Sequence, residues 1–161
     1  MPASDRRDRE AFDRPLNLDR GLAGTVGEPH YAIVDIGSNS VRMVVYDQLG
    51  RAPLPRYVEK SLARLGDGLA QTESISEDGF RRTVEALRRF RAIADAMGVS
   101  RVDVTATEAI RRAINGKALV AAIREASGLE VRILKGDEEA RFSALGVISG
   151  FYRPVGVVGD M

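Results

Sequence analysis

Four short segments of the sequence concentrate residue types that can hold phosphate groups, a metal ion or a reactive water. The first lies between two apolar stretches and reads Asp35-Ile36-Gly37-Ser38-Asn39-Ser40-Val41-Arg42. Gly37 allows a backbone to approach a ligand closely, and successive N–H groups in such a turn can bind an anion. Asp35 could hold a metal ion or its water, and Arg42 could reach a phosphate oxygen. An ordinary hairpin turn explains these residues about equally well.

The second segment joins the end of an apolar stretch to the start of a helix and reads Thr105-Ala106-Thr107-Glu108-Ala109-Ile110-Arg111-Arg112. Free N–H groups and the helix dipole favour anions at such a junction. Arg111 follows one turn later and could clamp a phosphate. A plain helix cap with a solvated arginine is the alternative, and it is the commoner situation.

The third segment carries two adjacent glutamates and reads Gly136-Asp137-Glu138-Glu139-Ala140-Arg141. A carboxylate here could act as a general base or orient a water for attack on phosphorus. The helix dipole alone also favours acidic residues in a first turn.

The fourth segment, Val157-Val158-Gly159-Asp160-Met161, ends an apolar stretch on an aspartate, as Ile33-Val34-Asp35 does. Two strands that bring aspartates to one edge could hold a divalent metal between Asp35 and Asp160.

Strands and helices must position these segments, and the apolar pattern predicts both. We expect strands over 31–36, 41–47, 54–62, 101–105, 130–134 and 155–159, and helices over 77–97, 108–114, 117–127 and 138–149. Ser76 is the predicted N-cap of the first helix, and residues 66–76 are predicted to be a loop. The helix faces are predicted from apolar spacing, with Phe80, Val84, Leu87, Ala94 and Met97 on the first and Phe142, Leu145 and Ile148 on the last.

The predicted order is β-β-β-α-β-α-α-β-α-β. Three meandering strands followed by βαβ crossovers form a mixed sheet with helices on its faces, so the fold class is α/β. Residues 1–29 are polar and show no period, which predicts a disordered N-terminal extension. Residues 30–161 then form a single lobe.

Composition excludes several classes of function. The 161 residues include no cysteine and only one histidine, His30, so thiolate and histidine-rich metal sites are excluded. A net charge of +1 argues against nucleic acid as a partner. No apolar run approaches the length of a membrane span and no secretory signal is visible, so we expect a cytoplasmic protein that binds no membrane.

Taken together, the four segments resemble the exopolyphosphatase/guanosine pentaphosphate phosphohydrolase family, within the superfamily of actin, sugar kinases and Hsp70. The resemblance covers about residues 31–161. It implies an actin-like (ribonuclease H-like) lobe that ends before the Gly-Gly-Gly-Ser turn of the second phosphate loop. We therefore expect a truncated N-terminal lobe that is inactive alone, and a homodimer of the full-length protein.

The resemblance also implies a role for each segment. The first is similar to the family's phosphate loop, so Gly37, Ser38, Asn39 and Ser40 would bind phosphate. The second matches the stretch that supplies a phosphate-binding arginine, here Arg111, and Arg42 would assist it. The third matches the segment with the catalytic glutamate; alignment on Ala140-Arg141 assigns that role to Glu139, with Glu138 as the fallback. Mg²⁺ or another divalent cation would be held by Asp35 and Asp160.

The implied activity is hydrolysis of terminal phosphoanhydride bonds of inorganic polyphosphate, with release of orthophosphate. Conversion of guanosine pentaphosphate to the tetraphosphate uses the same loops and stays open. An actin-like ATP-binding assembly protein is an alternative of another class, which the first and third segments disfavour. A non-enzymatic dimerisation or regulatory role is a further alternative.

Overall fold

The sheet is built from five strands in a computed structural model that describes residues 30–47 and 53–150. Strands β1 (His30–Ile36), β2 (Ser40–Tyr46) and β3 (Pro55–Leu62) form the predicted antiparallel meander. Strands β4 (Val99–Ala106) and β5 (Val131–Ile133) are parallel to β1, as βαβ crossovers require. The sheet order is β3-β2-β1-β4-β5.

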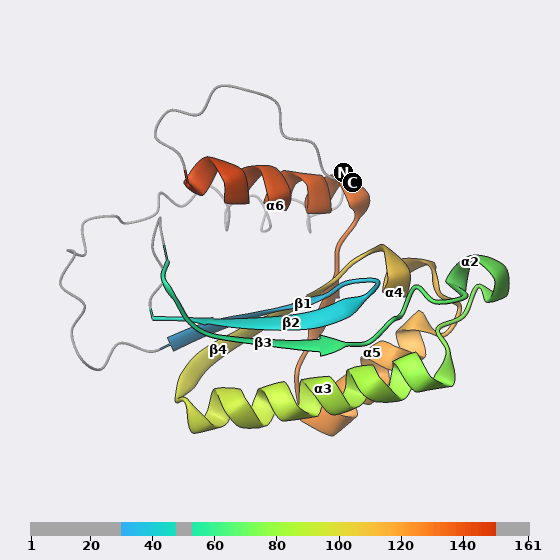
Figure 1. The fold of residues 1–161 in the computed structure, drawn as a ribbon, viewed down its shortest axis with the longest axis horizontal. Helices are drawn as coiled ribbons and strands as arrows, with labels where there is room; N and C mark the ends of the chain where they lie inside the picture. The colour runs from blue at the N-terminus through green and yellow to red at the C-terminus, as the bar shows by residue number, and fades with distance from the viewer. Residues whose placement is uncertain (1–29, 48–52, 151–161) are drawn as a thin grey trace, which may run out of the picture.

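Helices cover both faces of this sheet (Figure 1). The long helix α3 (Glu77–Ala96) packs with α5 (Gly116–Ser127) on one face, whereas α6 (Gly136–Ser149) lies over the other. Two short helices, α2 (Leu69–Thr72) and α4 (Glu108–Arg112), lie near the ends of the strands. Ser76 caps α3 as predicted, because its hydroxyl accepts a hydrogen bond from the N–H of Gly79 at 3.2 Å.

The core lies between the sheet and the α3/α5 layer. Every second residue of β1 and β2 points into it, and these side chains have no solvent exposure: Ala32, Val34, Ile36, Val41, Met43 and Val45. Phe90 of α3 and Ile123 of α5 are equally buried against them. Each large apolar side chain in this layer contributes about 1.5–3 kcal/mol through burial.

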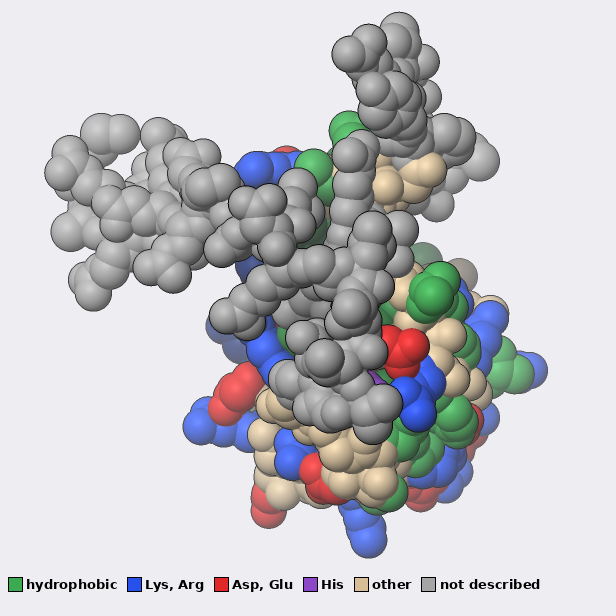
Figure 2. Space-filling view, turned by 90° about the vertical axis from the view of Figure 1, so that its left-hand side faces the viewer, with side chains coloured by type: hydrophobic (Ala, Val, Ile, Leu, Met, Phe, Trp, Pro, Cys, Tyr) green, Lys and Arg blue, Asp and Glu red, His purple; other side chains and the backbone are tan. Residues whose placement is uncertain are grey.

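The surface carries its charges as mixed pairs. Figure 2 shows lysine and arginine side chains interspersed with aspartate and glutamate on one side of the molecule. Several exposed arginines pair with carboxylates, for example Arg91 with Asp95 at 2.6 Å and Arg124 with Glu130 at 2.9 Å. The described residues include no helix long and apolar enough to cross a membrane.

Two predicted elements differ from the structure. Residues 69–72 form the one-turn helix α2 inside the predicted loop, between Gly68 and Glu73, which both have left-handed backbones. A single turn is too short to produce a periodic apolar pattern, which is why the sequence does not reveal it. The helix and strand ends that differ from the predicted ones do so by one or two residues.

The apolar face predicted for the last helix is present but not buried. Leu145 and Ile148 of α6 are each 44% exposed, and no residue of α6 is buried. The apolar face predicted for α3 agrees better with the structure, since Leu87 and Ala94 are buried. That prediction omits Phe90, which is also buried. The extension 1–29 and the strand predicted over 155–159 lie outside the described residues.

Candidate phosphate pocket

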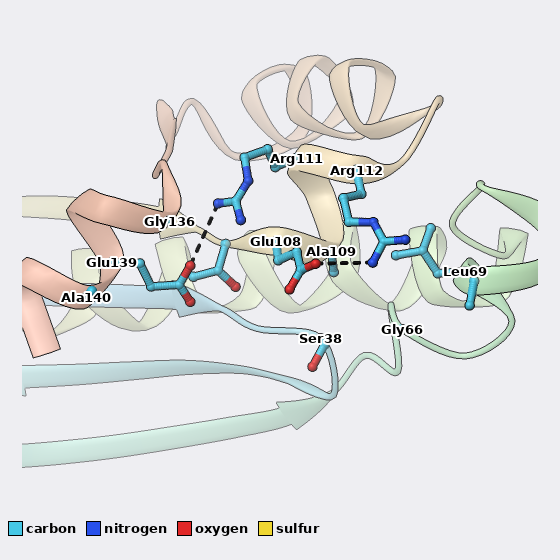
Figure 3. A pocket seen from close by; sticks show the side chains of 12 residues that line it. Ser38, Gly66, Leu69, Glu108, Ala109, Arg111, Arg112, Gly136, Glu139 and Ala140 are labelled. Carbon is cyan, nitrogen blue, oxygen red and sulfur yellow. Dashed lines mark hydrogen bonds and ion pairs between the residues drawn. The ribbon is translucent and has the colours of Figure 1, made fainter. Parts of the chain in front are cut away.

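A cavity of about 540 Å³ opens where β1, β4 and β5 end (Figure 3). Its walls come from four separate parts of the chain, which meet only in the folded structure. The lining residues are Ser38, Gly66, Leu69, Ala70, Thr107, Glu108, Ala109, Arg111, Arg112, Gly136, Glu139 and Ala140. Three predicted site residues, Ser38, Arg111 and Glu139, are therefore brought together.

The turn between β1 and β2 supplies Ser38. The turn closes through the N–H of Gly37, which donates to the carbonyl of Ser40 at 3.0 Å. The Gly37 N–H is thus bonded within its own turn, and phosphate binding by residues 37–40 stays a prediction. Of the four turn residues, only Ser38 lines the cavity.

A second loop holds this turn in place. The N–H groups of Ala63 and Arg64 both donate to the carbonyl of Asn39, at 3.0 and 2.9 Å, and that of Gly66 donates to Ser38 at 2.8 Å. Arg64 adopts a left-handed backbone with φ of 54° to make this contact. The loop after β3 therefore fixes the position of the turn at residues 37–40 and also lines the pocket through Gly66.

Arg111 projects from α4 toward Glu139. Its guanidinium donates to the carbonyl of Leu134 at 2.5 Å and lies 3.8 Å from a carboxylate oxygen of Glu139, with both side chains one-third exposed. Thr107 directly precedes α4, and its side chain makes no capping hydrogen bond. This five-residue helix is instead held by the residues that follow it.

Two hydrogen bonds of Asn115, together called the latch, join the turn after α4 to the loop before α3. Its side-chain oxygen accepts from the N–H of Ile75 and its amide donates to the carbonyl of Ile75, both at 2.9 Å. The neighbouring Gly116 cannot be replaced without movement, because an added Cβ would lie 2.1 Å from the carbonyl oxygen of Ile110. These contacts fix α4 and therefore its two arginines.

The two glutamates of the third segment have different surroundings. Glu138 accepts a hydrogen bond from the N–H of Lys135 at 2.9 Å and pairs with Arg132 at 2.5 Å. The backbone bond, followed by Arg132, lowers the pKa of Glu138. Glu139 instead lines the pocket beside Arg111. Glu138 thus caps α6, whereas Glu139 faces the cavity.

Asp35 and Arg42 lie next to the pocket rather than in it. They are paired across β1 and β2, on the sheet face opposite the core. Asp35 lines a second cavity, of about 950 Å³, between the sheet and α6, and Glu139 lines both cavities. Asp35 keeps access to solvent, but partial desolvation of its carboxylate raises its pKa. A hydrogen bond with the Thr105 side chain and the charge of Arg42 oppose this rise.

The described residues supply only part of a metal site. No group of three or more histidine, aspartate or glutamate side chains among them is placed to hold a metal ion. Asp35 is the one predicted ligand in this part of the chain, and Asp160 lies outside it. Magnesium is commonly held by one or two carboxylates together with phosphate oxygens of the substrate, and a partly desolvated Asp35 is compatible with that arrangement.

Several lining residues have no signal in the sequence. Gly66 reaches the pocket through its backbone hydrogen bond to Ser38, and Leu69 and Ala70 follow it in the chain; no local pattern reveals this long-range contact. Arg112 could have been predicted as a lining residue, because it directly follows Arg111 and precedes a helix break.

The fold and the pocket define an α/β lobe with an arginine and a carboxylate facing a serine-bearing turn. The profile of the Ppx/GppA phosphatase family matches residues 33–160, and the chain belongs to that family. Exopolyphosphatase 1 of Mycobacterium tuberculosis is 29% identical over 116 residues, which are 71% of this chain and 34% of that protein. The chain thus spans about a third of the length of this curated relative.

Solved structures of family members share the fold. The Aquifex aeolicus PPX-GPPA enzyme is 30% identical and superposes with a TM-score of 0.73, over 80% of this chain and 42% of that one. An exopolyphosphatase from Cytophaga hutchinsonii is 29% identical with a TM-score of 0.69, over 73% and 38% of the two chains. The predicted family and α/β fold are confirmed.

Proposed function

We propose that this chain is one lobe of an exopolyphosphatase, which removes orthophosphate from the end of inorganic polyphosphate. The observation that carries the proposal is the cavity lined by Ser38, Arg111 and Glu139, in which Arg111 lies 3.8 Å from Glu139. The similarity to an exopolyphosphatase of Mycobacterium tuberculosis supports the choice of substrate.

The proposed reaction gives a separate role to each of three side chains that line the cavity. Ser38 binds the terminal phosphate, and Arg111 neutralises the charge that develops on its oxygens. Glu139 orients a water and accepts its proton as the water oxygen bonds to phosphorus. The bridging P–O bond breaks, so that orthophosphate and a chain shorter by one phosphate leave.

A divalent cation is part of the proposal. Mg²⁺ between Asp35, Asp160 and the substrate would neutralise phosphate charge when bound. We expect chelation with EDTA to abolish phosphate release from the full-length protein and added Mg²⁺ to restore it. Full activity after exhaustive chelation would remove the cation from the proposal.

Hydrolysis of guanosine pentaphosphate is the second candidate, because the chain belongs to the Ppx/GppA phosphatase family and the same loops are expected to serve both activities. Phosphate release from polyphosphate and from guanosine pentaphosphate should be measured side by side with the full-length protein. A higher kcat/KM on polyphosphate supports the proposal, and a higher value on the nucleotide overturns it. Membership of a phosphatase family disfavours an ATP-binding assembly role, which direct ATP-binding measurements on the same protein test.

We expect the 161-residue chain alone to be inactive, because it spans about a third of the length of the exopolyphosphatase that it matches. Turnover of long-chain polyphosphate by the purified 161-residue chain, lost in Glu139→Gln, would contradict this. We also propose a cytoplasmic homodimer of the full-length protein, and light scattering tests its dimeric state.

A further inference from the structure

The pocket contains two arginines, and they lie toward opposite ends. Arg111 leans toward Glu139, whereas Arg112 points toward Leu69 (Figure 3). Consecutive residues of a helix diverge by about 100°, so the two arginine side chains leave α4 in different directions. Ser38 lies between them on the facing wall of the pocket (Figure 3).

Within residues 30–47 and 53–150, the ion pair of Arg112 is with a residue of its own helix. Its guanidinium lies 3.1 Å from a carboxylate oxygen of Glu108, and both side chains are more than 60% exposed. An exposed ion pair of this kind contributes little stability. A phosphate oxygen could therefore replace Glu108 as the partner of Arg112 with little loss.

The cavity is also larger than the volume that a single phosphate group requires. Its volume of about 540 Å³ lies in the range of roughly 300–1,000 Å³ that is typical of sites for extended organic ligands. A substrate whose terminal phosphate lies at Arg111 and Glu139 would have further phosphates in the part of the cavity near Arg112 and Leu69.

We propose that Arg112 forms an outer phosphate subsite, which binds the inner phosphates of a linear polyphosphate while Arg111 and Glu139 face its terminal phosphate. Glu108 occupies this subsite in the free protein by pairing with Arg112. The inference rests on the proposed function and adds a specificity determinant to it, because the subsite increases the affinity for a chain of phosphates but not for a single phosphate.

The test measures KM for long-chain polyphosphate and the inhibition constant of orthophosphate in the full-length protein. We expect Arg112→Ala to raise KM about tenfold, through loss of a charged contact, and to change orthophosphate inhibition less than twofold. The salt dependence of polyphosphate affinity should fall by roughly one phosphate contact. Glu108→Gln should lower KM, since it frees Arg112, and Arg112→Lys should restore part of the affinity.

The matched control is Arg124→Ala, which removes an equally exposed, ion-paired arginine on α5 that does not line the pocket. If Arg124→Ala raises KM as much as Arg112→Ala does, the effect is one of net charge and the subsite is wrong. A wild-type KM in Arg112→Ala also overturns the subsite and leaves the proposed function intact. A wild-type protein that releases no phosphate from polyphosphate overturns both. Thermal unfolding of each variant separates a binding defect from misfolding.

Discussion

One face of the sheet is closed by α3 and α5, whereas the opposite face lies open beneath α6. Along β1, Ala32, Val34 and Ile36 are fully buried, but the alternate residue Ile33 is 39% exposed and Asp35 remains accessible. The alternation of a strand therefore assigns stability to one face and leaves polar groups for chemistry on the other face and at the strand ends. Variants on the two sides should consequently have separable effects on activity and stability.

The largest effect is expected from Glu139→Gln in the full-length protein. Loss of a general base lowers the rate of phosphate release by about 10²–10⁴-fold. Because Glu139 is exposed by a third and makes only a 3.8 Å ion pair, the unfolding temperature should stay close to that of the wild type. Phosphate-release kinetics and circular dichroism measure the two quantities.

The neighbouring glutamate is the internal control for that variant. Glu138→Gln should retain activity, because Glu138 caps α6 and does not line the pocket. Wild-type rates in Glu139→Gln, together with a loss of activity in Glu138→Gln, would transfer the catalytic role to Glu138.

The opposite result is expected on the closed face. Phe90→Ala removes a fully buried ring from the core and should reduce the free energy of unfolding by about 3–5 kcal/mol. Val58→Ala is the matched control, since Val58 is 46% exposed on the outer side of β3, and it should change stability by less than about 0.5 kcal/mol. Urea unfolding measures both; similar losses in the two variants would mean that the faces do not differ as described.

A smaller effect is expected at the latch between α4 and the loop before α3. Asn115→Ala leaves the N–H and carbonyl of Ile75 without the two bonds they make at 2.9 Å. The expected cost is about 1–3 kcal/mol of unfolding free energy, if water replaces the amide only in part. Because the latch positions α4, activity should also fall more than it does in Phe90→Ala when both proteins are assayed well below their unfolding temperatures. Equal relative activities would show that Asn115 is only a structural residue.

Much of the fold could be predicted from the sequence, because it depends on local patterns. The apolar runs of β1 and β2 lie where predicted. The site could be predicted only in part. Ser38, Arg111 and Glu139 stand in segments with local chemical signals, and they meet in one cavity.

The remaining wall of the pocket depends on long-range contacts that no local pattern contains. Gly66 is brought to the cavity by its bond to Ser38, 28 positions away in the chain (66 − 38). The bonding of the Gly37 N–H within its own turn likewise follows from hairpin geometry, which residue types alone do not specify. Chemical identity therefore predicts candidates, and only tertiary structure decides which of them line the cavity.

The smallest effect concerns pH and the cap of α6. Hydrogen bonding to Lys135 lowers the pKa of Glu138 in the folded protein, so its contribution to stability is present above the ordinary pKa of a glutamate, about 4.3. That contribution is lost as the pH falls through the lowered value, because protonation removes the charged acceptor. Relative to the intrinsic exchange rate at each pH, hydrogen exchange at the start of α6 should accordingly increase below about pH 4 in the wild type. The increase should be weaker in Glu138→Gln and unchanged in Glu139→Gln, since Glu138 rather than Glu139 binds the Lys135 N–H. An equally weakened increase in both variants would contradict the division of roles between the two glutamates.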